Sequence, residues 1–286
     1  MEYLAALHPA TLYALVVVLG LLVGSFLNVV MLRFPAALIH DWKCQCRELL
    51  GLDSGEAPEE TPAGIASGRS RCPSCGRNIA WYDNIPVASW LILRGRCREC
   101  GTTISMRYPV VELLTAIFSV LVIWQLGPTA AGLAGLVFTW TLIGAAGIDL
   151  EHKLLPDQLT LPLLWLGLIL NVFGVFTDLE SAVFGAVAGY LMLWLVFHLF
   201  RLVTGKEGMG YGDFKLLAAI GAWFGWQVLP TVILLASGVG AVLGLALIAL
   251  RKMGREVPIA FGPFLAAAGW LVLVGGDAIV DFWLLI

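Results

Sequence analysis

The chain has 286 residues, of which 59% are hydrophobic and 13% charged, and its mean hydropathy is +0.89. A soluble domain cannot bury so large an apolar fraction, so the composition excludes that class and predicts several helices within a lipid bilayer. The formal net charge of -3 leaves no broad basic surface, and we therefore expect no nucleic-acid partner.

Eight apolar runs follow one another along the chain, most of them close to the roughly 20 residues that a helix needs to cross a bilayer. The sixth run is short, and we expect it to share a bent or broken path with the seventh. The sequence thus predicts an all-α polytopic membrane protein with about eight transmembrane helices. The runs cover residues 10–32, 108–126, 130–148, 158–176, 181–203, 214–226, 228–250 and 258–276.

The 17 Lys and Arg residues predict the orientation of these helices, because with eight spans every one lies on or beside the same side of the membrane. The positive-inside rule places their loops, 34–107, 149–157, 204–213 and 251–257, in the cytoplasm and both termini in the periplasm. No basic segment precedes the first run, as it would in a signal peptide, so we expect a retained helix.

The long cytoplasmic insert contains two CxxC pairs that are separated by 21 residues and are each followed by glycine. Two such turns bring four thiolates within tetrahedral reach, which predicts a structural zinc site that staples a small lobe. Free or redox-active thiols are the alternative, whereas a reducing cytoplasm argues against disulfides. The predicted zinc ligands are Cys72, Cys75, Cys97 and Cys100.

Two further features of the insert receive no functional assignment. Residues 53–70 are rich in Pro, Gly, Glu and Ser, which is typical of a mobile linker. Cys44 and Cys46 form a CxC pair, a pattern that can bind metal, although we expect two free cytoplasmic thiols near the membrane surface.

Two aspartates stand where an apolar run meets the cytoplasm. Asp149 closes the third run and Asp213 opens the sixth, so the predicted topology puts both at the same depth. Ionisable groups beside lipid are costly and indicate function. A close carboxyl pair holds one proton between its members, which lets one activate water while the other polarises a peptide carbonyl. The sequence predicts an intramembrane aspartyl protease, although Asp213 could instead cap a helix and Asp149 could be an interfacial charge.

Other acidic residues give weaker signals. Glu112 lies more than a turn inside the second run, where a lone carboxylate needs either a role or a partner such as Arg107. Asp157 follows Pro156 and precedes an apolar run, so we expect it to be an N-cap.

These motifs together resemble the type IV prepilin peptidases, the bifunctional leader peptidase and N-methyltransferase family with a GxGD motif. The resemblance extends from about residue 20 to residue 265. It is carried by GSFLNVVMLRFP (24–35), CPSCG (72–76), IPVASWLILRGRCREC (85–100), RYPVVELLTA (107–116), IDLEHKLLPD (148–157), TLPLLWLGL (160–168) and GMGYGDFKLLAAIGAW (208–223). The chain departs from the simplest family pattern in its insert at 36–70 and in Cys44 and Cys46.

The resemblance implies a bacterial inner-membrane enzyme that cuts the leader of a prepilin or pseudopilin at the cytoplasmic face. It further implies that the new N-terminus is methylated from S-adenosylmethionine. Asp149 and Asp213 match the family's catalytic aspartates, and the paired cysteines match its zinc lobe. For methyl transfer we expect the region around Gly95, Arg96 and Glu112. The resulting division of the chain is a first transmembrane helix (1–33), an insert with the zinc lobe (34–107) and a seven-helix catalytic domain (108–286).

Two other classes of protein are alternatives. A proton-coupled transporter would spread ionisable residues through the depth of the membrane and would contain an internal repeat. The sequence shows neither pattern. A zinc-lobed assembly scaffold without catalysis would leave Asp149 and Asp213 without a role.

Overall fold

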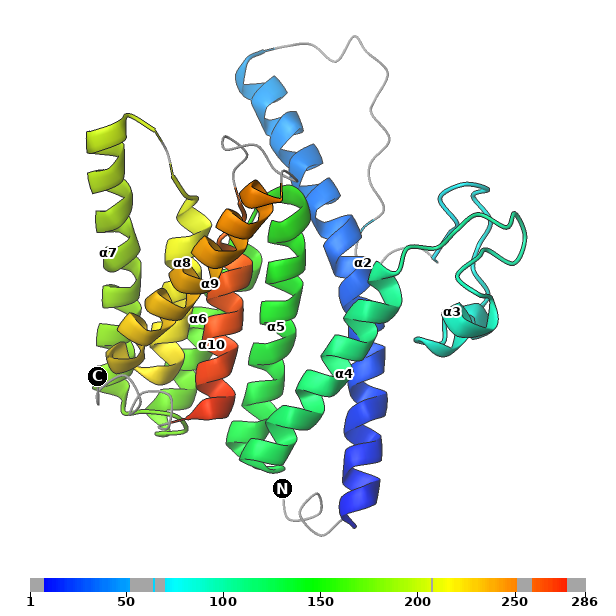
Figure 1. The fold of residues 1–286 in the computed structure, drawn as a ribbon, viewed down its shortest axis with the longest axis horizontal. Coiled ribbons are helices and arrows are strands. Elements are labelled where there is room, and N and C mark those ends of the chain that lie inside the picture. The colour runs from blue at the N-terminus through cyan, green and yellow to red at the C-terminus, as the bar shows by residue number, and fades with distance from the viewer. Residues whose placement is uncertain (1–7, 52–63, 65–69, 207, 251–258, 277–286) are drawn as a thin grey trace. The chain divides into compact units, whose positions relative to one another are not determined.

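The computed structural model describes residues 8–51, 64, 70–206, 208–250 and 259–276, and within these ranges the chain forms helices and no strand (Figure 1). The helices are α2 (Pro9–Leu49), α3 (Ala88–Ile92), α4 (Arg107–Leu126), α5 (Ala130–His152), α6 (Asp157–Val172), α7 (Leu179–Thr204), α8 (Tyr211–Phe224), α9 (Leu229–Ala249) and α10 (Gly262–Gly275), with short 3-10 turns η1 (Trp81–Asn84) and η2 (Trp226–Val228).

The helices confirm the predicted all-α membrane fold. Each of the eight apolar runs coincides with one of the longer helices, and the sixth and seventh runs form the broken pair α8 and α9. Five helical stretches are long and apolar enough to cross a membrane, whereas α6 and α10 are shorter apolar helices. These five are Pro9–Leu49, Arg107–Leu126, Ala130–His152, Leu179–Thr204 and Trp226–Leu247.

The chain divides within α4 into two compact units, Leu7–Val120 and Leu121–Ile286. In the first unit, α2 continues through Pro35 and ends only at Leu49, beyond the boundary predicted at residue 33. An apolar run predicts only the part of a helix that lies in lipid. The helix itself can continue into polar sequence, because each added residue forms one more backbone hydrogen bond. The functional division of the chain stays a prediction.

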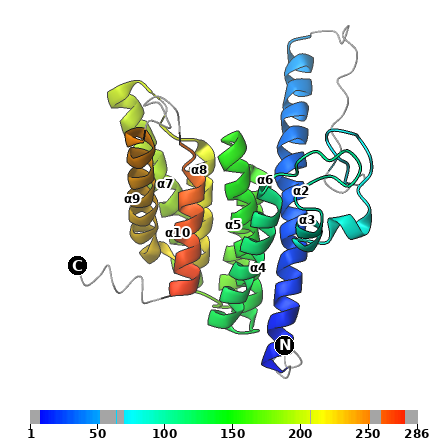
Figure 2. The ribbon, with the colours of Figure 1, turned by 45° about the vertical axis from the view of Figure 1, so that its right-hand side comes forward.

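In the second unit, α8 is the most deeply buried helix and packs against α6, α7 and α10. Figure 2 shows α7 and α10 next to it. Its apolar side chains cover the whole circumference, as expected for a helix surrounded by others. Gly185 of α7 and Gly221 of α8 allow the closest contact, because a Cβ at either would lie 2.2 Å from the other's carbonyl oxygen. This packing fixes the position of the first turn of α8, which carries Asp213.

Several predictions concern residues outside the described ranges. They are the periplasmic location of both termini, the cytoplasmic loop at 251–257 and almost all of the linker at 53–70.

Candidate active site and metal centre

Asp149 and Asp213 line one cavity of about 480 Å³ in the second unit. Asp149 comes from the last turn of α5 and Asp213 from the first turn of α8, and residues 259–261 before α10 complete the lining. Each aspartate is only 6% exposed, and their carboxyl groups are close enough for their charges to interact. The structure therefore brings together the two aspartates that the sequence predicts as a pair.

The Asp149 carboxyl group is held by a backbone N–H from a distant helix. Gly262, the first residue of α10, donates a hydrogen bond of 3.0 Å to Asp149 Oδ2. A carboxylate in the last turn of α5 faces the negative end of that helix, and the N-terminus of α10 offers it a positive end instead. The Lys153 side chain adds a favourable charge interaction with Asp149.

Asp213 makes one capping hydrogen bond and leaves its other oxygen available. Its Oδ2 accepts a hydrogen bond of 3.3 Å from the Gly210 N–H. Gly210 is the N-cap of α8 and Asp213 its third helical residue, so this is the side-chain hydrogen bond of a capping box. Asp213 Oδ1 is buried and has no hydrogen-bond partner. The alternative role as a helix cap is thus partly present, and it leaves one oxygen for a substrate or water.

Steric contact with Leu155 explains why Gly212, the last glycine of the GxGD motif, carries no side chain. A Cβ on Gly212 would lie 2.5 Å from Leu155 Cβ, so a side chain there would push the first turn of α8 away from the segment after α5. A Cβ on Gly262 would lie 2.9 Å from Leu155 Cδ1. Leu155 therefore packs between the segments that carry Asp213 and the Asp149 hydrogen-bond donor.

Gly262 is a site residue that the sequence analysis missed. The available signal was a Gly-Pro pair at 262–263, at the start of the last apolar run, where proline favours the first turn of a helix. Nothing in that pattern indicates that its N–H faces a carboxylate 113 residues earlier.

The interpretation of Asp157 as an N-cap is wrong. The N-cap of α6 is Pro156, and Asp157 is the first helical residue. Its carboxylate instead accepts a hydrogen bond of 2.5 Å from Lys215 Nζ on α8. A cation within reach competes with the backbone for the carboxylate, and the sequence could not reveal that cation.

The four predicted ligand cysteines form one cluster in the first unit, with all four Sγ atoms within 4.8 Å of one another. A thiolate-bound metal such as zinc, about 2.3 Å from each sulfur, separates tetrahedral sulfurs by roughly 3.8 Å. The Sγ atoms of Cys72 and Cys100 lie 3.7 Å apart. The group can therefore hold one metal ion with little movement.

Local hydrogen bonds stabilise the thiolate form of two of these cysteines. The hydroxyl and backbone N–H of Thr102 lower the pKa of Cys100 to about 6. Backbone N–H groups of Cys75 and Ser74 lower the pKa of Cys72. The Arg77 backbone N–H lowers the pKa of Cys75, but desolvation and the neighbouring Cys72 and Cys100 thiols outweigh it and raise that pKa to about 11. Since only the thiolate binds metal, the local environment favours metal binding at two of the four cysteines.

The region predicted for methyl transfer is only partly assembled as expected. Glu112 lines a cavity of about 620 Å³ in the first unit, but neither Gly95 nor Arg96 is among the described residues that line it. Gly95 lies against Trp90, which lines the cavity. A Cβ on Gly95 would lie 2.7 Å from the Trp90 ring. Arg96 is exposed.

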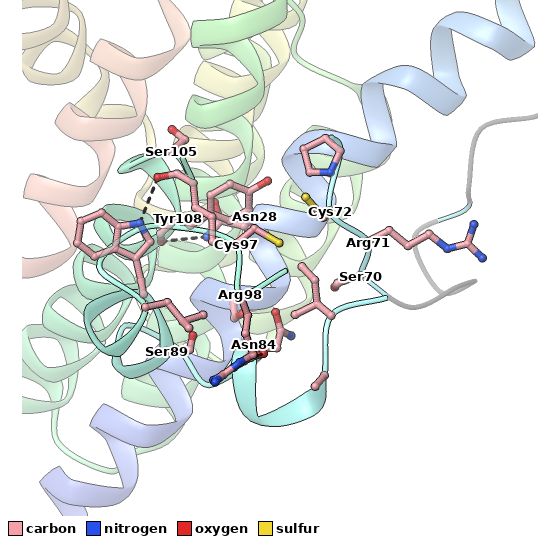
Figure 3. A pocket seen from close by; sticks show the side chains of 18 of the residues that line it. Asn28, Ser70, Arg71, Cys72, Asn84, Ser89, Cys97, Arg98, Ser105 and Tyr108 are labelled. Atoms are coloured by element: carbon pink, nitrogen blue, oxygen red, sulfur yellow. Dashed lines mark hydrogen bonds and ion pairs between the residues drawn. The ribbon is translucent and has the colours of Figure 1, made fainter. Parts of the chain in front are cut away.

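The alternative to a functional role for Glu112 was an ion pair with Arg107. The hydrogen bonds to the Glu112 carboxyl group come instead from a backbone N–H and a hydroxyl group. Glu112 Oε2 accepts the backbone N–H of Val87 at 2.8 Å, and the Ser25 hydroxyl bonds to the same carboxyl group. Figure 3 shows this cavity, whose lining includes Asn28 and Tyr108 as well as Cys72 and Cys97 of the cysteine cluster.

Comparisons with known proteins agree with this geometry. The family model described as the bacterial peptidase A24 N-terminal domain matches residues 18–126, and the type IV leader peptidase family matches residues 136–245. A Pseudomonas aeruginosa protein named prepilin leader peptidase/N-methyltransferase is 52% identical over 99% of this chain and 97% of its own length. Proteins of the same name from Stutzerimonas stutzeri and Aeromonas hydrophila are 53% and 52% identical, over 99% and 96% of this chain and 97% and 95% of their own lengths. No solved structure matches the chain.

Proposed function

Because this chain belongs to the type IV leader peptidase family, we propose that it cleaves the leader of a prepilin or pseudopilin and methylates the new N-terminus. The observation that carries the peptidase half is the shared cavity of Asp149 and Asp213, two buried carboxyl groups at one end of the second unit. A scaffold gives no reason for this pairing, and a proton-coupled transporter would spread its ionisable residues through the depth of the membrane.

The reaction needs one proton on the carboxyl pair. The ionised carboxylate removes a proton from a water molecule, and the water oxygen attacks the scissile carbonyl carbon. The protonated carboxyl group donates its proton to the carbonyl oxygen, which stabilises the charge that develops there. Collapse of the tetrahedral intermediate breaks the C–N bond, and the leaving amine takes up a proton. The Gly262 N–H, which holds Asp149 in place, and the unpartnered Asp213 Oδ1, which is left for water or substrate, support this arrangement.

We propose zinc as the metal of the cysteine cluster, with a structural role. All four ligands are protein sulfurs, which leaves no open coordination position for catalysis. The metal would staple together the two CxxC turns, each of which is closed by one isolated β-bridge, Arg71 with Asn78 and Arg96 with Thr103. Cys44 and Cys46 lie outside the cluster, and Cys44 Sγ is 3.6 Å from His40 Nε2.

Methyl transfer is proposed to occur at a separate site in the first unit. When bound, S-adenosylmethionine supplies a methyl group carried by a sulfonium. The protein must hold the freed amine unprotonated and shield it from bulk water. Glu112 is a buried carboxylate beside the cavity of the cysteine lobe and can accept the amine proton.

We further propose an inner-membrane location with the proteolytic cavity at the cytoplasmic face and both termini periplasmic. The distribution of Lys and Arg supports this orientation. The cavity supports it too, because its lining comes from the segments 149–155, 208–213 and 259–261, at or beside three of the loops predicted to be cytoplasmic.

The test uses the Asp149→Asn variant and a pilin from which the leader has already been removed. We expect the variant to transfer labelled methyl groups from S-adenosylmethionine at a near wild-type rate, although it does not cut the intact prepilin. Loss of both activities in folded protein would point to one shared site. If the wild-type protein neither cuts nor methylates any pilin-type substrate, the proposed function is wrong.

A further inference from the structure

The segment GSFLNVV of α2 packs closely against α4 beside the cavity that Glu112 lines. A Cβ on Gly24 would lie 2.6 Å from the Cα of Glu112, so the backbones of α2 and α4 touch at this point. Ser25 and Asn28 follow within the next turn of α2 and line the same cavity as Glu112. The close contact therefore places polar groups of two helices together at the cavity wall.

Asn28 carries an unused acceptor in this wall. Its Nδ2 group donates to the carbonyl oxygen of Gly24 at 3.2 Å. It also donates to the carbonyl oxygen of Tyr108 at 3.1 Å (Figure 3). These two bonds use both amide protons and fix which side of the amide is the oxygen. Asn28 is 1% exposed, and its Oδ1 has no hydrogen-bond partner. A buried carbonyl without a donor is uncommon and calls for a ligand or an ordered water.

Glu112 contributes negative charge and spare hydrogen-bonding capacity to the same wall. Its carboxylate can accept about four hydrogen bonds, and the structure gives it the Val87 N–H and the Ser25 hydroxyl. Val87 donates from a backbone with φ +60, which a β-branched residue rarely adopts. Asn28 Oδ1 and the Glu112 carboxylate together suit a donor-rich, positively charged group, and the arginines that line the same cavity suit a carboxylate on that ligand. These arginines are Arg33, Arg71, Arg77 and Arg98.

The rest of the cavity suits a flat organic group. Its volume of about 620 Å³ lies within the range of small-molecule sites, about 300–1,000 Å³. The ring of Trp90 lines it and is held in place because Nε1 donates to the Ile104 carbonyl oxygen at 3.2 Å. Such a ring can stack on a purine.

We infer that this cavity binds S-adenosylmethionine and that Asn28 is one of its binding residues, with Asn28 Oδ1 and the Glu112 carboxylate contacting the cationic end of the ligand. The inference rests on the proposed function, since it assigns the methyl donor to a place and to a residue. The ammonium and sulfonium groups of the donor provide the charge that these two oxygens accept.

Binding of labelled S-adenosylmethionine to the full-length protein in detergent tests the inference. A hydrogen bond to a charged group makes a large contribution, so Asn28→Leu should weaken binding at least about tenfold. Gln125→Leu is the matched control, an amide replaced by the same residue on α4 away from the cavity, and its affinity should equal that of the wild type. Wild-type affinity in Asn28→Leu would overturn the inference.

Ultraviolet crosslinking of the labelled donor to the wild-type protein decides the matter if Asn28→Leu fails to fold. Label in peptides from residues 25–33 or 87–112 supports the inference, and label confined to residues 121–276 overturns it. Failure of the wild-type protein to bind the donor at all would instead contradict the proposed methyl transfer.

Discussion

The backbone N–H of Gly262 donates a 3.0 Å hydrogen bond to Asp149 Oδ2 across 113 residues of sequence. A Cβ on Gly262 would lie 2.7 Å from that oxygen, so the close approach depends on glycine. The bond links the position of α10 to the geometry of the proposed catalytic pair, and α10 begins beyond the part of the chain that the type IV leader peptidase family model matches.

Gly262→Ala should lower kcat for leader cleavage by roughly ten- to a hundredfold with little change in KM. The added methyl group displaces the Asp149 carboxyl group, and small displacements of a catalytic group cost about this much. Initial rates across a range of prepilin concentrations separate the two constants.

Gly269→Ala is the control for this variant, since it adds the same methyl group to the same helix. Its Cβ would lie 2.8 Å from Ile220 Cδ1, the end of a flexible side chain, rather than from the carboxyl pair. We expect kcat close to that of the wild type. Equal losses in the two variants would show that α10 tolerates no extra volume and would remove the positioning role of Gly262.

The exposed ion pair between Lys215 and Asp157 should contribute little to stability. Its side chains are 26% and 51% exposed, and pairs of this kind contribute about 0.2–1 kcal/mol. A double-mutant cycle with Lys215→Met and Asp157→Asn, followed by unfolding in detergent at low and high salt, measures the coupling. A coupling well above this range that persists in high salt would mean that the pair is shielded from solvent and acts in the site.

The sequence predicted those parts of the sites whose chemistry depends on residue type and local spacing. Two CxxC turns bring cysteines together wherever the lobe lies, which is why the cysteine cluster was foreseen. Asp149 and Asp213 were paired because both stand at the cytoplasmic end of an apolar run, and membrane depth is a coordinate that sequence provides.

Contacts that depend on tertiary packing could not be predicted from the sequence. The Gly262 N–H and the unpartnered oxygen of Asn28 become visible only when α10 meets α5 and α2 meets α4. Asp157 was misread as a cap because its partner, Lys215, follows 58 residues later. Gly95 was placed near the methyl-transfer region, but its contact is with the ring of Trp90 rather than with the cavity.

Replacing Cys72 and Cys97 together by serine should abolish zinc binding and loosen the lobe. Each pair would lose one thiolate, and the remaining two sulfurs cannot complete a tetrahedral site. Elemental analysis of the purified protein should give one zinc per chain in the wild type and none in the variant. Because metal binding requires deprotonated thiols, zinc should also be released on acidification.

The matched control for the zinc prediction replaces Cys44 and Cys46 by serine, which removes the same number of thiols outside the cluster. This variant should keep its zinc. A drop in its zinc content would bring the CxC pair into the metal site, and retention of zinc by the Cys72 and Cys97 variant would rule out the proposed ligand set.

The proposed peptidase depends most directly on the two aspartates, and the decisive measurement is cleavage of a prepilin in detergent by single asparagine variants. Asp149→Asn and Asp213→Asn should each lose at least about a hundredfold in rate, as expected when a general acid or base is removed. Asp157→Asn, an aspartate outside the cavity lining, should cleave at close to the wild-type rate. If the folded Asp149 or Asp213 variant cleaves as fast as Asp157→Asn, that residue is not part of a catalytic pair and the proposed mechanism is wrong.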